Sequence, residues 1–354
     1  MISSNFVIAK EHRTSIAVIG ALTALAVGAF VWLIRNDMPV ANPERLVNTF
    51  VDHVQEGALN SDGVNWTATR RAALAELPKN PTEQDVYRAY RTVLHALGDN
   101  HTHHVPREHF ARLGAPARNN GNSPQFVTTS IEPGGIARIE VRGYMSVNPN
   151  RVITDGFEAL AMIEKALQPS TCGIIVDLSA NAGGNMYPMF MALMPLLGTG
   201  TLMRHVDRHR KAHNFSWVLD DEASKKWLGE YARQIRDRAE KSSSWNETAK
   251  RPIAVIQSRS TGSSGEATLI ALRGRSHVKT FGTPSAGYAT SNQLIPLADG
   301  SALALTVARM ADRNGTVYHS QVSPDVDVST SNLSANEAAM QYLRAACPET
   351  GTSR

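Results

Sequence analysis

The most informative part of the chain is Pro252-Ile-Ala-Val-Ile-Gln-Ser-Arg-Ser-Thr-Gly-Ser-Ser-Gly-Glu-Ala-Thr-Leu-Ile-Ala-Leu272. Its first part is a short apolar run typical of a strand, Ser260–Glu266 is a Ser/Gly-rich turn, and its last part indicates a helix. A strand-to-helix turn points a hydroxyl group towards solvent and leaves backbone N–H groups unpaired at the helix N-terminus. The turn therefore predicts a nucleophilic serine, Ser263 or Ser264. N-capping of the helix, with Glu266 completing a capping box, explains the same residues without catalysis.

A second strand, Gly-rich turn and helix occur nearer the N-terminus. The nearly all-apolar run Cys172-Gly-Ile-Ile-Val-Asp-Leu178 predicts a buried strand and ends in Ser179-Ala-Asn-Ala-Gly-Gly-Asn185. A hydrophobic helix is expected from Met186 to Leu197. Further elements are expected as strands over 126–131, 136–141 and 292–307, the last broken by a turn at 298–300, and as a helix over 154–167. Strand, Gly-rich turn and helix thus occur twice, here and around Ser263.

The apolar residues of the segment 44–97 recur at helical spacing, which predicts three short helices. Asn80-Pro-Thr-Glu83 predicts the start of the last helix, with Asn80 as its N-cap. The charged stretch from Leu202 to Lys250 is expected to form a helical surface insertion. The predicted domains are residues 1–40 (tail and anchor), 41–110 (helical subdomain), 111–345 (core, with the insertion at about 202–250) and 346–354 (tail).

The composition is that of an ordinary globular protein with a small positive charge. Of the 354 residues, 42% are hydrophobic and 19% are charged, and the net charge is +4. Basic residues are scattered except over Arg204–Lys211, where no aromatic residue is interleaved with them. A nucleic-acid partner is therefore not expected.

The uncharged, mostly apolar stretch from Thr14 to Ile34 is about long enough to cross a bilayer. We interpret it as a single membrane helix acting as a signal anchor; the small residues at 26–30 leave cleavage of this helix open. The flanking basic residues Lys10, Arg13 and Arg35 slightly favour a cytoplasmic N-terminus. The expected location is the inner or cell membrane, with the catalytic body on the extracytoplasmic (periplasmic) side.

Cys172 and Cys347 are the only cysteines. Outside the cytosol they could form a disulfide, but two separate thiols explain the sequence equally well, because sequence contains no Cα distance. Their pairing is open at this stage.

Several motifs occur in an order that resembles the tail-specific, or carboxyl-terminal processing, serine peptidases. The motifs are Leu97-Gly-Asp-Asn-His-Thr102, Gly173–Asn185, Thr261–Glu266, Phe281-Gly-Thr-Pro-Ser-Ala-Gly287, Leu297-Ala-Asp-Gly300 and Ser323-Pro-Asp-Val326. The resemblance covers residues 45 to 330. It implies a crotonase-like (ClpP/crotonase) αβ spiral core behind a small helical N-terminal subdomain, and hydrolysis of peptide bonds.

Many members of that family carry a PDZ domain before the core, but here only residues 105–125 separate His104 from the first core strand. A PDZ domain cannot fit into this interval. Substrate selection is therefore expected to come from elsewhere, and the insertion at 202–250 is a candidate lid.

The family's serine motif places the nucleophile three residues before the glutamate, which selects Ser263. Ser264 is then expected to supply one oxyanion N–H, and the Gly-rich turn the other, with Gly183 as the best match and Gly184 beside it. The carboxyl-terminal processing branch pairs its serine with a lysine, but Tyr288 stands at that position here. Another base is required.

The tricorn-like branch takes its base from a histidine at the place of His101, so His101 is the expected general base. The third group is open: Asp99, Tyr318 and His319 are candidates for orienting the imidazole. The family's strand-end motif usually reads Asp-Leu-Arg-Gly-Asn, whereas this chain has Ser179 and Ala180. An active enzyme is still expected.

The resulting hypothesis is a serine endopeptidase that cleaves extracytoplasmic proteins or peptides through an acyl-enzyme, without cofactor or metal. Its partners are a peptide or protein substrate and, through the N-terminal helix, the membrane; the oligomeric state is open. Two other functions compete. Closely spaced histidines, His101, His103 and His104, could bind a metal. The same fold also serves non-hydrolytic ligand-binding proteins.

Overall fold

The computed structural model describes residues 42–116, 125–198, 200–216, 237–238, 243–248 and 250–347. The predicted anchor at 14–34, most of the predicted lid and the tail at 348–354 lie outside these ranges. Within them, no helix is long and apolar enough to span a membrane. The described chain divides into two compact units, which we treat separately.

The smaller unit contains residues up to Glu56, Asn60–Asp99 and Leu297–Asp299. As expected, it holds three helices, with a 3-10 turn between the first two: α2 Pro43–Gly57, η1 Ser61–Gly63, α3 Trp66–Ala75 and α4 Glu83–Leu97. The ring of Phe50 on α2 stacks on that of Tyr90 on α4, with centroids 4.0 Å apart. Helix α4 begins later than predicted, because Thr82 rather than Asn80 is the N-cap and exchanges hydrogen bonds with Asp85.

The larger unit holds Gly57–Leu59, Asn100–Pro296 and the chain from Gly300 onwards. His101 therefore lies in this unit, although a helical subdomain that extends to residue 110 is predicted from the sequence. The short elements that follow His101 are β1 His103–Val105 and α5 Arg107–Leu113.

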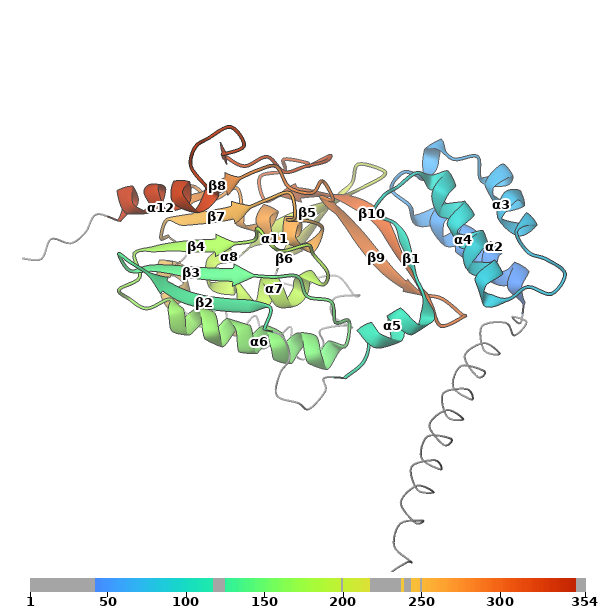
Figure 1. Cartoon of the computed structure of the whole chain (residues 1–354), viewed down its shortest axis with the longest axis horizontal. Helices are drawn as coiled ribbons and strands as arrows, with labels where there is room; N and C mark the ends of the chain where they lie inside the picture. The colour runs from blue at the N-terminus through green and yellow to red at the C-terminus, as the bar shows by residue number, and fades with distance from the viewer. Residues whose placement is uncertain are drawn as a thin grey trace, which may run out of the picture. The chain divides into compact units, whose positions relative to one another are not determined.

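A six-stranded sheet in the order β11-β8-β7-β4-β3-β2 forms the centre of the larger unit (Figure 1). All neighbouring pairs are parallel except β2 with β3. The strands are β2 Val127–Glu132, β3 Ile136–Val141, β4 Gly173–Asp177, β7 Ile253–Gln257, β8 Val278–Gly282 and β11 Val326–Asp327. Side chains alternate between two cores, so Ile174 and Val176 of β4 enter one while Ile175 enters the other.

Helices cover both faces of this sheet, as the apolar strands require. The larger core lies beneath α6 Pro149–Ala166, α7 Met186–Ala192, α8 Met194–Leu197 and α11 Ser264–Leu272, whereas α12 Ala335–Ala346 closes the other core. Helix α6 starts before the predicted residue 154 because Asn148 caps it and Pro149 occupies its first turn.

A second, antiparallel sheet surrounds the long strand β10, and its members are β1, β5 Thr201–Asp207, β6 Ala212–Ser216, β9 Thr290–Pro296 and β10 Ala302–Asp312. The predicted hairpin is confirmed as β9 and β10. The helical prediction for the start of the insertion is wrong, because residues 201–216 form β5 and β6. Leu202, Met203 and Phe215 are buried there, and β5 pairs with β10. Near the end of the predicted insertion, Ser243–Thr248 form helix α10.

The two cysteines form a disulfide. Cys172 precedes β4 and Cys347 follows α12, and their Cα atoms are 5.8 Å apart. The bond therefore ties the end of α12 to the beginning of β4, an interior strand of the central sheet, and closes a loop between residues that are 175 apart in sequence. This resolves the pairing that sequence alone leaves open.

Candidate active site

Ser263 lies in the turn between β7 and α11, as predicted from sequence. It is the N-cap of α11 and has φ 50° and ψ −114°, a conformation that costs a residue with a Cβ atom free energy. Its backbone N–H donates to Glu266 Oε2 at 2.8 Å. The strained turn is thus held by the glutamate three residues later.

Glu266 is fully buried and ties the serine turn to the loop 285–287. Besides Ser263 it accepts hydrogen bonds from the Ser285 hydroxyl at 2.5 Å and from the Gly287 N–H at 2.9 Å, both at Oε1. Burial raises the pKa of the carboxyl group above its ordinary value, and the donated hydrogen bonds oppose that rise. The predicted capping glutamate therefore also anchors the loop that contains Tyr288.

His101 contacts the predicted nucleophile directly. Its Nε2 lies 3.0 Å from Ser263 Oγ, although the two residues are 162 apart in sequence. The ring is also positioned through the backbone, since Asn292 Nδ2 donates to the His101 carbonyl oxygen at 2.9 Å. Of the alternatives Ser263 and Ser264, the structure brings only Ser263 to the imidazole, because the Ser264 hydroxyl donates instead to the Gly184 carbonyl at 2.6 Å.

The second ring nitrogen of His101 contacts Thr290, a residue that the sequence analysis missed. Nδ1 lies 2.7 Å from Thr290 Oγ1. If Nε2 is to accept the Ser263 proton, Nδ1 must carry the hydrogen and donate it to the threonine oxygen. The only sequence signal was a hydroxyl two residues after Tyr288, and nothing local connects it with a histidine 189 residues away.

The predicted orienting groups have other positions. The Tyr318 hydroxyl donates to Asp312 Oδ2 at 3.3 Å, and burial raises the pKa of Tyr318 to about 12. His319 is exposed and makes no hydrogen bond within the described part of the chain. Thr290 occupies the place beside Nδ1, and an orienting role for Tyr318 or His319 stays a prediction. Asp99 belongs to the smaller unit, whose segment Asn60–Asp99 ends there. Its role as an orienting group stays a prediction.

The Gly-rich turn after β4 packs against the serine turn after β7. These strands are parallel neighbours, so their carboxyl ends meet at one edge of the sheet. Gly183 has φ +104°, and a Cβ there would lie 2.7 Å from the Gly262 carbonyl oxygen and 2.9 Å from Ser263 Cβ. Glycine is needed at this position because any side chain would displace the nucleophile.

The two candidate glycines differ in their N–H groups. The Gly183 N–H donates to Asn181 Oδ1 at 3.0 Å, which engages the amide predicted to bind the oxyanion. Among the described residues, neither the Gly184 N–H nor the Ser264 N–H has a hydrogen-bond partner. The geometry therefore favours Gly184 and Ser264 as the pair of donors, with Gly183 in a supporting position.

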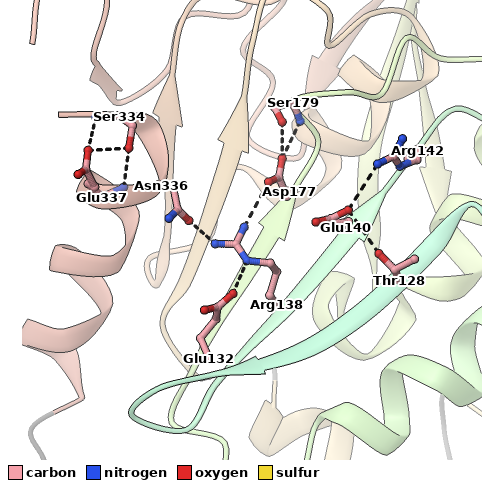
Figure 2. A network of polar contacts seen from close by, with 10 residues as sticks. All are labelled: Thr128, Glu132, Arg138, Glu140, Arg142, Asp177, Ser179, Ser334, Asn336 and Glu337. Atoms are coloured by element: carbon pink, nitrogen blue, oxygen red, sulfur yellow. Dashed lines mark hydrogen bonds and ion pairs between the residues drawn. The ribbon is translucent and has the colours of Figure 1, made fainter. Parts of the chain in front are cut away.

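Asp177 at the end of β4 shapes the beginning of this turn (Figure 2). Its Oδ1 accepts hydrogen bonds from the N–H and hydroxyl of Ser179, and its Oδ2 lies 3.2 Å from Arg138 Nη1 of β3. Arg138 also pairs with Glu132 on β2 and contacts Asn336 at the start of α12. The family usually has an arginine in this turn, where this chain has Ser179. Here Arg138, from the neighbouring strand β3, pairs with Asp177.

The histidine-rich stretch forms no recognisable metal centre. His103 Nδ1 lies 3.0 Å from the His101 carbonyl oxygen. In the ranges that the structure covers, no group of three or more histidine, cysteine, aspartate or glutamate side chains is arranged to hold a metal ion.

Comparison with known proteins identifies the family. The pattern of peptidase family S41 matches residues 143–328, more than half of the chain. The chain belongs to peptidase family S41. The resemblance to tail-specific peptidases is thereby confirmed, and the protein is a serine-type peptidase.

Two other comparisons found proteins that are similar to most of this chain. The nisin-resistance protein of Lactococcus lactis subsp. lactis is 28% identical over 300 residues, covering 84% of this chain and 86% of that protein. A lipoprotein from Streptococcus agalactiae has a similar structure, with a TM-score of 0.70, 24% identity and coverage of 86% of this chain and 97% of that one.

The photosystem II D1 C-terminal processing protease shares the fold with a TM-score of 0.56 and 15% identity, covering 88% of this S41 chain and 100% of that chain. The predicted α/β fold with a helical N-terminal region is therefore confirmed.

Proposed function

We propose that this S41 peptidase cleaves peptide bonds through a covalent acyl-enzyme, with Ser263 as nucleophile and His101 as general base. The contact of 3.0 Å between His101 Nε2 and Ser263 Oγ carries this proposal. A neutral imidazole has a suitable pKa for taking a serine proton near neutral pH. The carboxyl-terminal processing branch uses a lysine as base, but this chain has Tyr288 at that position.

In the first step Ser263 Oγ attacks the peptide carbonyl carbon and gives its proton to His101 Nε2. The carbonyl oxygen becomes an oxyanion, which accepts hydrogen bonds from the Gly184 and Ser264 N–H groups. The C–N bond then breaks, and His101 transfers the proton to the leaving amine. A water molecule then attacks the ester carbonyl carbon and gives a proton to His101. His101 returns the proton to Ser263 Oγ as the ester bond breaks, which releases the acid and the free serine.

Thr290 supports both steps without touching substrate. By accepting the Nδ1 hydrogen at 2.7 Å, its hydroxyl holds the tautomer in which Nε2 can accept the serine proton. A neutral hydroxyl stabilises the imidazolium less than a carboxylate would. We therefore infer that Thr290 is a positioning residue that sets the ring orientation and the tautomer.

We further propose that the catalytic body lies outside the inner or cell membrane and acts on extracytoplasmic proteins or peptides. The apolar stretch 14–34 supports an anchor, and the Cys172–Cys347 disulfide suits an oxidising compartment. Since a relative 28% identical is named a nisin-resistance protein, nisin is a rational first peptide to assay. Protease accessibility of the body in intact spheroplasts tests the location.

The mechanism is tested by treating the purified full-length protein with a serine-directed phosphonate and locating the adduct by peptide mass spectrometry. An adduct on Ser263 that is lost in Ser263→Ala and strongly slowed in His101→Ala is expected. The variant Ser264→Ala is the matched control, because its backbone N–H remains and its hydroxyl does not reach His101. An adduct elsewhere, or none in folded protein, would contradict the proposal and favour a ligand-binding role.

A further inference from the structure

Two large apolar side chains are exposed beside the proposed catalytic residues. Met145 is 59% exposed and Tyr288 is 40% exposed, and both are among the few large hydrophobic residues of the described chain with such exposure. A single exposed apolar side chain is ordinary on a protein surface, so the relevance of these two residues rests on their position beside His101 and Gly184. The question is which part of a substrate each one could contact.

Tyr288 lies on the imidazole side of the site. Its ring centroid is 5.2 Å from that of His101, and its Cδ2 lies 3.7 Å from where a Cβ on Gly262 would be. The segment is held by the hydrogen bond from the Gly287 N–H to Glu266 and by the buried neighbour Ala289. The backbone is thus fixed while the ring stays open to solvent.

Met145 lies on the oxyanion side. Its Sδ is 2.9 Å from the position of a Cβ on Gly184, the glycine whose N–H has no hydrogen-bond partner among the described residues. The segment around it is bonded to the Gly-rich turn: the Tyr144 N–H donates to the Gly183 carbonyl, and Asn185 Nδ2 donates to the Ser146 carbonyl. Tyr144 and Ser146 are buried, so only Met145 projects outwards.

The chemistry assigns the two sides. The leaving amine must receive a proton from His101 Nε2, so the residue that follows the scissile bond lies on the imidazole side, next to Tyr288. The acyl carbonyl oxygen must lie at the Gly184 and Ser264 amides, so the residue that precedes the scissile bond lies on the side of Met145. These assignments rest on the proposed mechanism.

We propose that Met145 and Tyr288 determine which residues this peptidase accepts on either side of the scissile bond. Met145 contacts the side chain before the bond, and Tyr288 contacts the side chain after it. Both contacts are apolar, so the favoured substrates carry aliphatic or aromatic residues at both positions. A flexible methionine adapts to several side-chain shapes, whereas the tyrosine ring presents one flat surface.

The test uses a library of peptides with blocked ends and randomised interiors, digested by the full-length protein and read by mass spectrometry. Quenched fluorescent peptides that differ at one position then measure the ratio of kcat/KM for leucine over alanine on each side of the bond. Met145→Ala is expected to reduce this ratio about tenfold before the bond and to leave it unchanged after the bond. Tyr288→Ala is expected to do the reverse.

Ile131→Ala is the matched control. Ile131 is 58% exposed, but it pairs with Ala137 near the beginning of β3 and so lies at the end of the sheet opposite the two catalytic turns. Its ratios should equal those of the parent. Acyl transfer to added amino-acid amides gives an independent readout, since only the amine side is involved, and Tyr288→Ala alone should lose preference among them.

The outcomes separate this inference from the mechanism. Cleavage that requires Ser263 but keeps its preferences in both variants would overturn the inference and leave the mechanism standing. Exchanged effects, with Tyr288→Ala acting before the bond, would overturn the assignment of sides. Absence of any Ser263-dependent cleavage or phosphonate labelling would overturn the proposed mechanism itself.

Discussion

Replacing Thr290 by valine tests whether a neutral hydroxyl orients the general base. Valine keeps the shape of threonine and removes only the Oγ1 atom that lies 2.7 Å from His101 Nδ1. In the variant the Nδ1 hydrogen loses its acceptor, and the imidazole can adopt the other tautomer, in which Nε2 carries the hydrogen and cannot take the serine proton. Activity should therefore fall although Ser263 and His101 are unchanged.

The size of the effect follows from the hydrogen bond. A neutral hydrogen bond is worth about 0.5–1.5 kcal/mol net, and a partly buried donor left without acceptor costs about 1–3 kcal/mol. Thr290 and His101 are both half-buried, so water replaces part of the lost contact. We expect a loss of about 2 kcal/mol in transition-state stabilisation, which corresponds to about a 30-fold lower kcat/KM.

The assay is kcat/KM on one fluorescent peptide for the parent, Thr290→Val and Thr290→Ser, together with the rate of phosphonate labelling. Serine retains the hydroxyl, so Thr290→Ser should stay within about threefold of the parent. Both variants should unfold at similar urea concentrations. Full activity in Thr290→Val would refute the positioning role, and equal losses in both variants would show that the methyl group, rather than the hydroxyl, matters.

Three further predictions concern the support of the site. Cys347→Ser should lower the free energy of unfolding by about 2–5 kcal/mol in urea titrations, and reductant added to the parent should produce a similar loss. Gly183→Ala should abolish phosphonate labelling, because its Cβ would lie 2.9 Å from Ser263 Cβ; Gly134→Ala, also at positive φ but with nothing within 4 Å, should cost only about 1–2 kcal/mol of stability and leave labelling intact. Glu266→Gln should lower stability by about 1–3 kcal/mol, because an amide cannot accept hydrogen bonds at both oxygen positions. Burial raises the Glu266 pKa above its ordinary 4.5, so the folded state holds this proton to higher pH than the unfolded chain. The difference in free energy of unfolding between the parent and Glu266→Gln should therefore shrink as pH rises above 4.5. A difference that grows with pH in parallel urea titrations would contradict this prediction.

Local patterns in the sequence were sufficient for the elements that carry the site. The apolar runs before Ser179 and Ser260 became β4 and β7, and each leads through its Gly-containing turn into a helix. The turn chemistry is short-range, since the glutamate three residues after Ser263 holds its N–H. These features depend on neighbours in the chain, so a reading of the sequence could find them.

The same reasoning failed where distant strands decide the structure. The charged composition after Leu202 suggested a helix, but β5 pairs with β10, and β6 pairs with β5 and buries Phe215 in the core. Charge and helical spacing describe only one segment, whereas strand pairing also depends on the partner. The predicted cap of α4 was two residues early for a local reason, because Thr82, and not Asn80, forms the capping box with Asp85.

The family, the α/β class, the nucleophilic turn and the histidine could all be predicted from the sequence, because short motifs in a specific order carry them. The tertiary structure alone decided the partner of the imidazole, the choice between the Gly183 and Gly184 amides, and the pairing of Cys172 with Cys347. Each of these depends on atoms brought within 2 to 6 Å of one another from segments far apart or from the two sides of one turn. Distances of this kind arise only when the strands pack, and no local pattern encodes them.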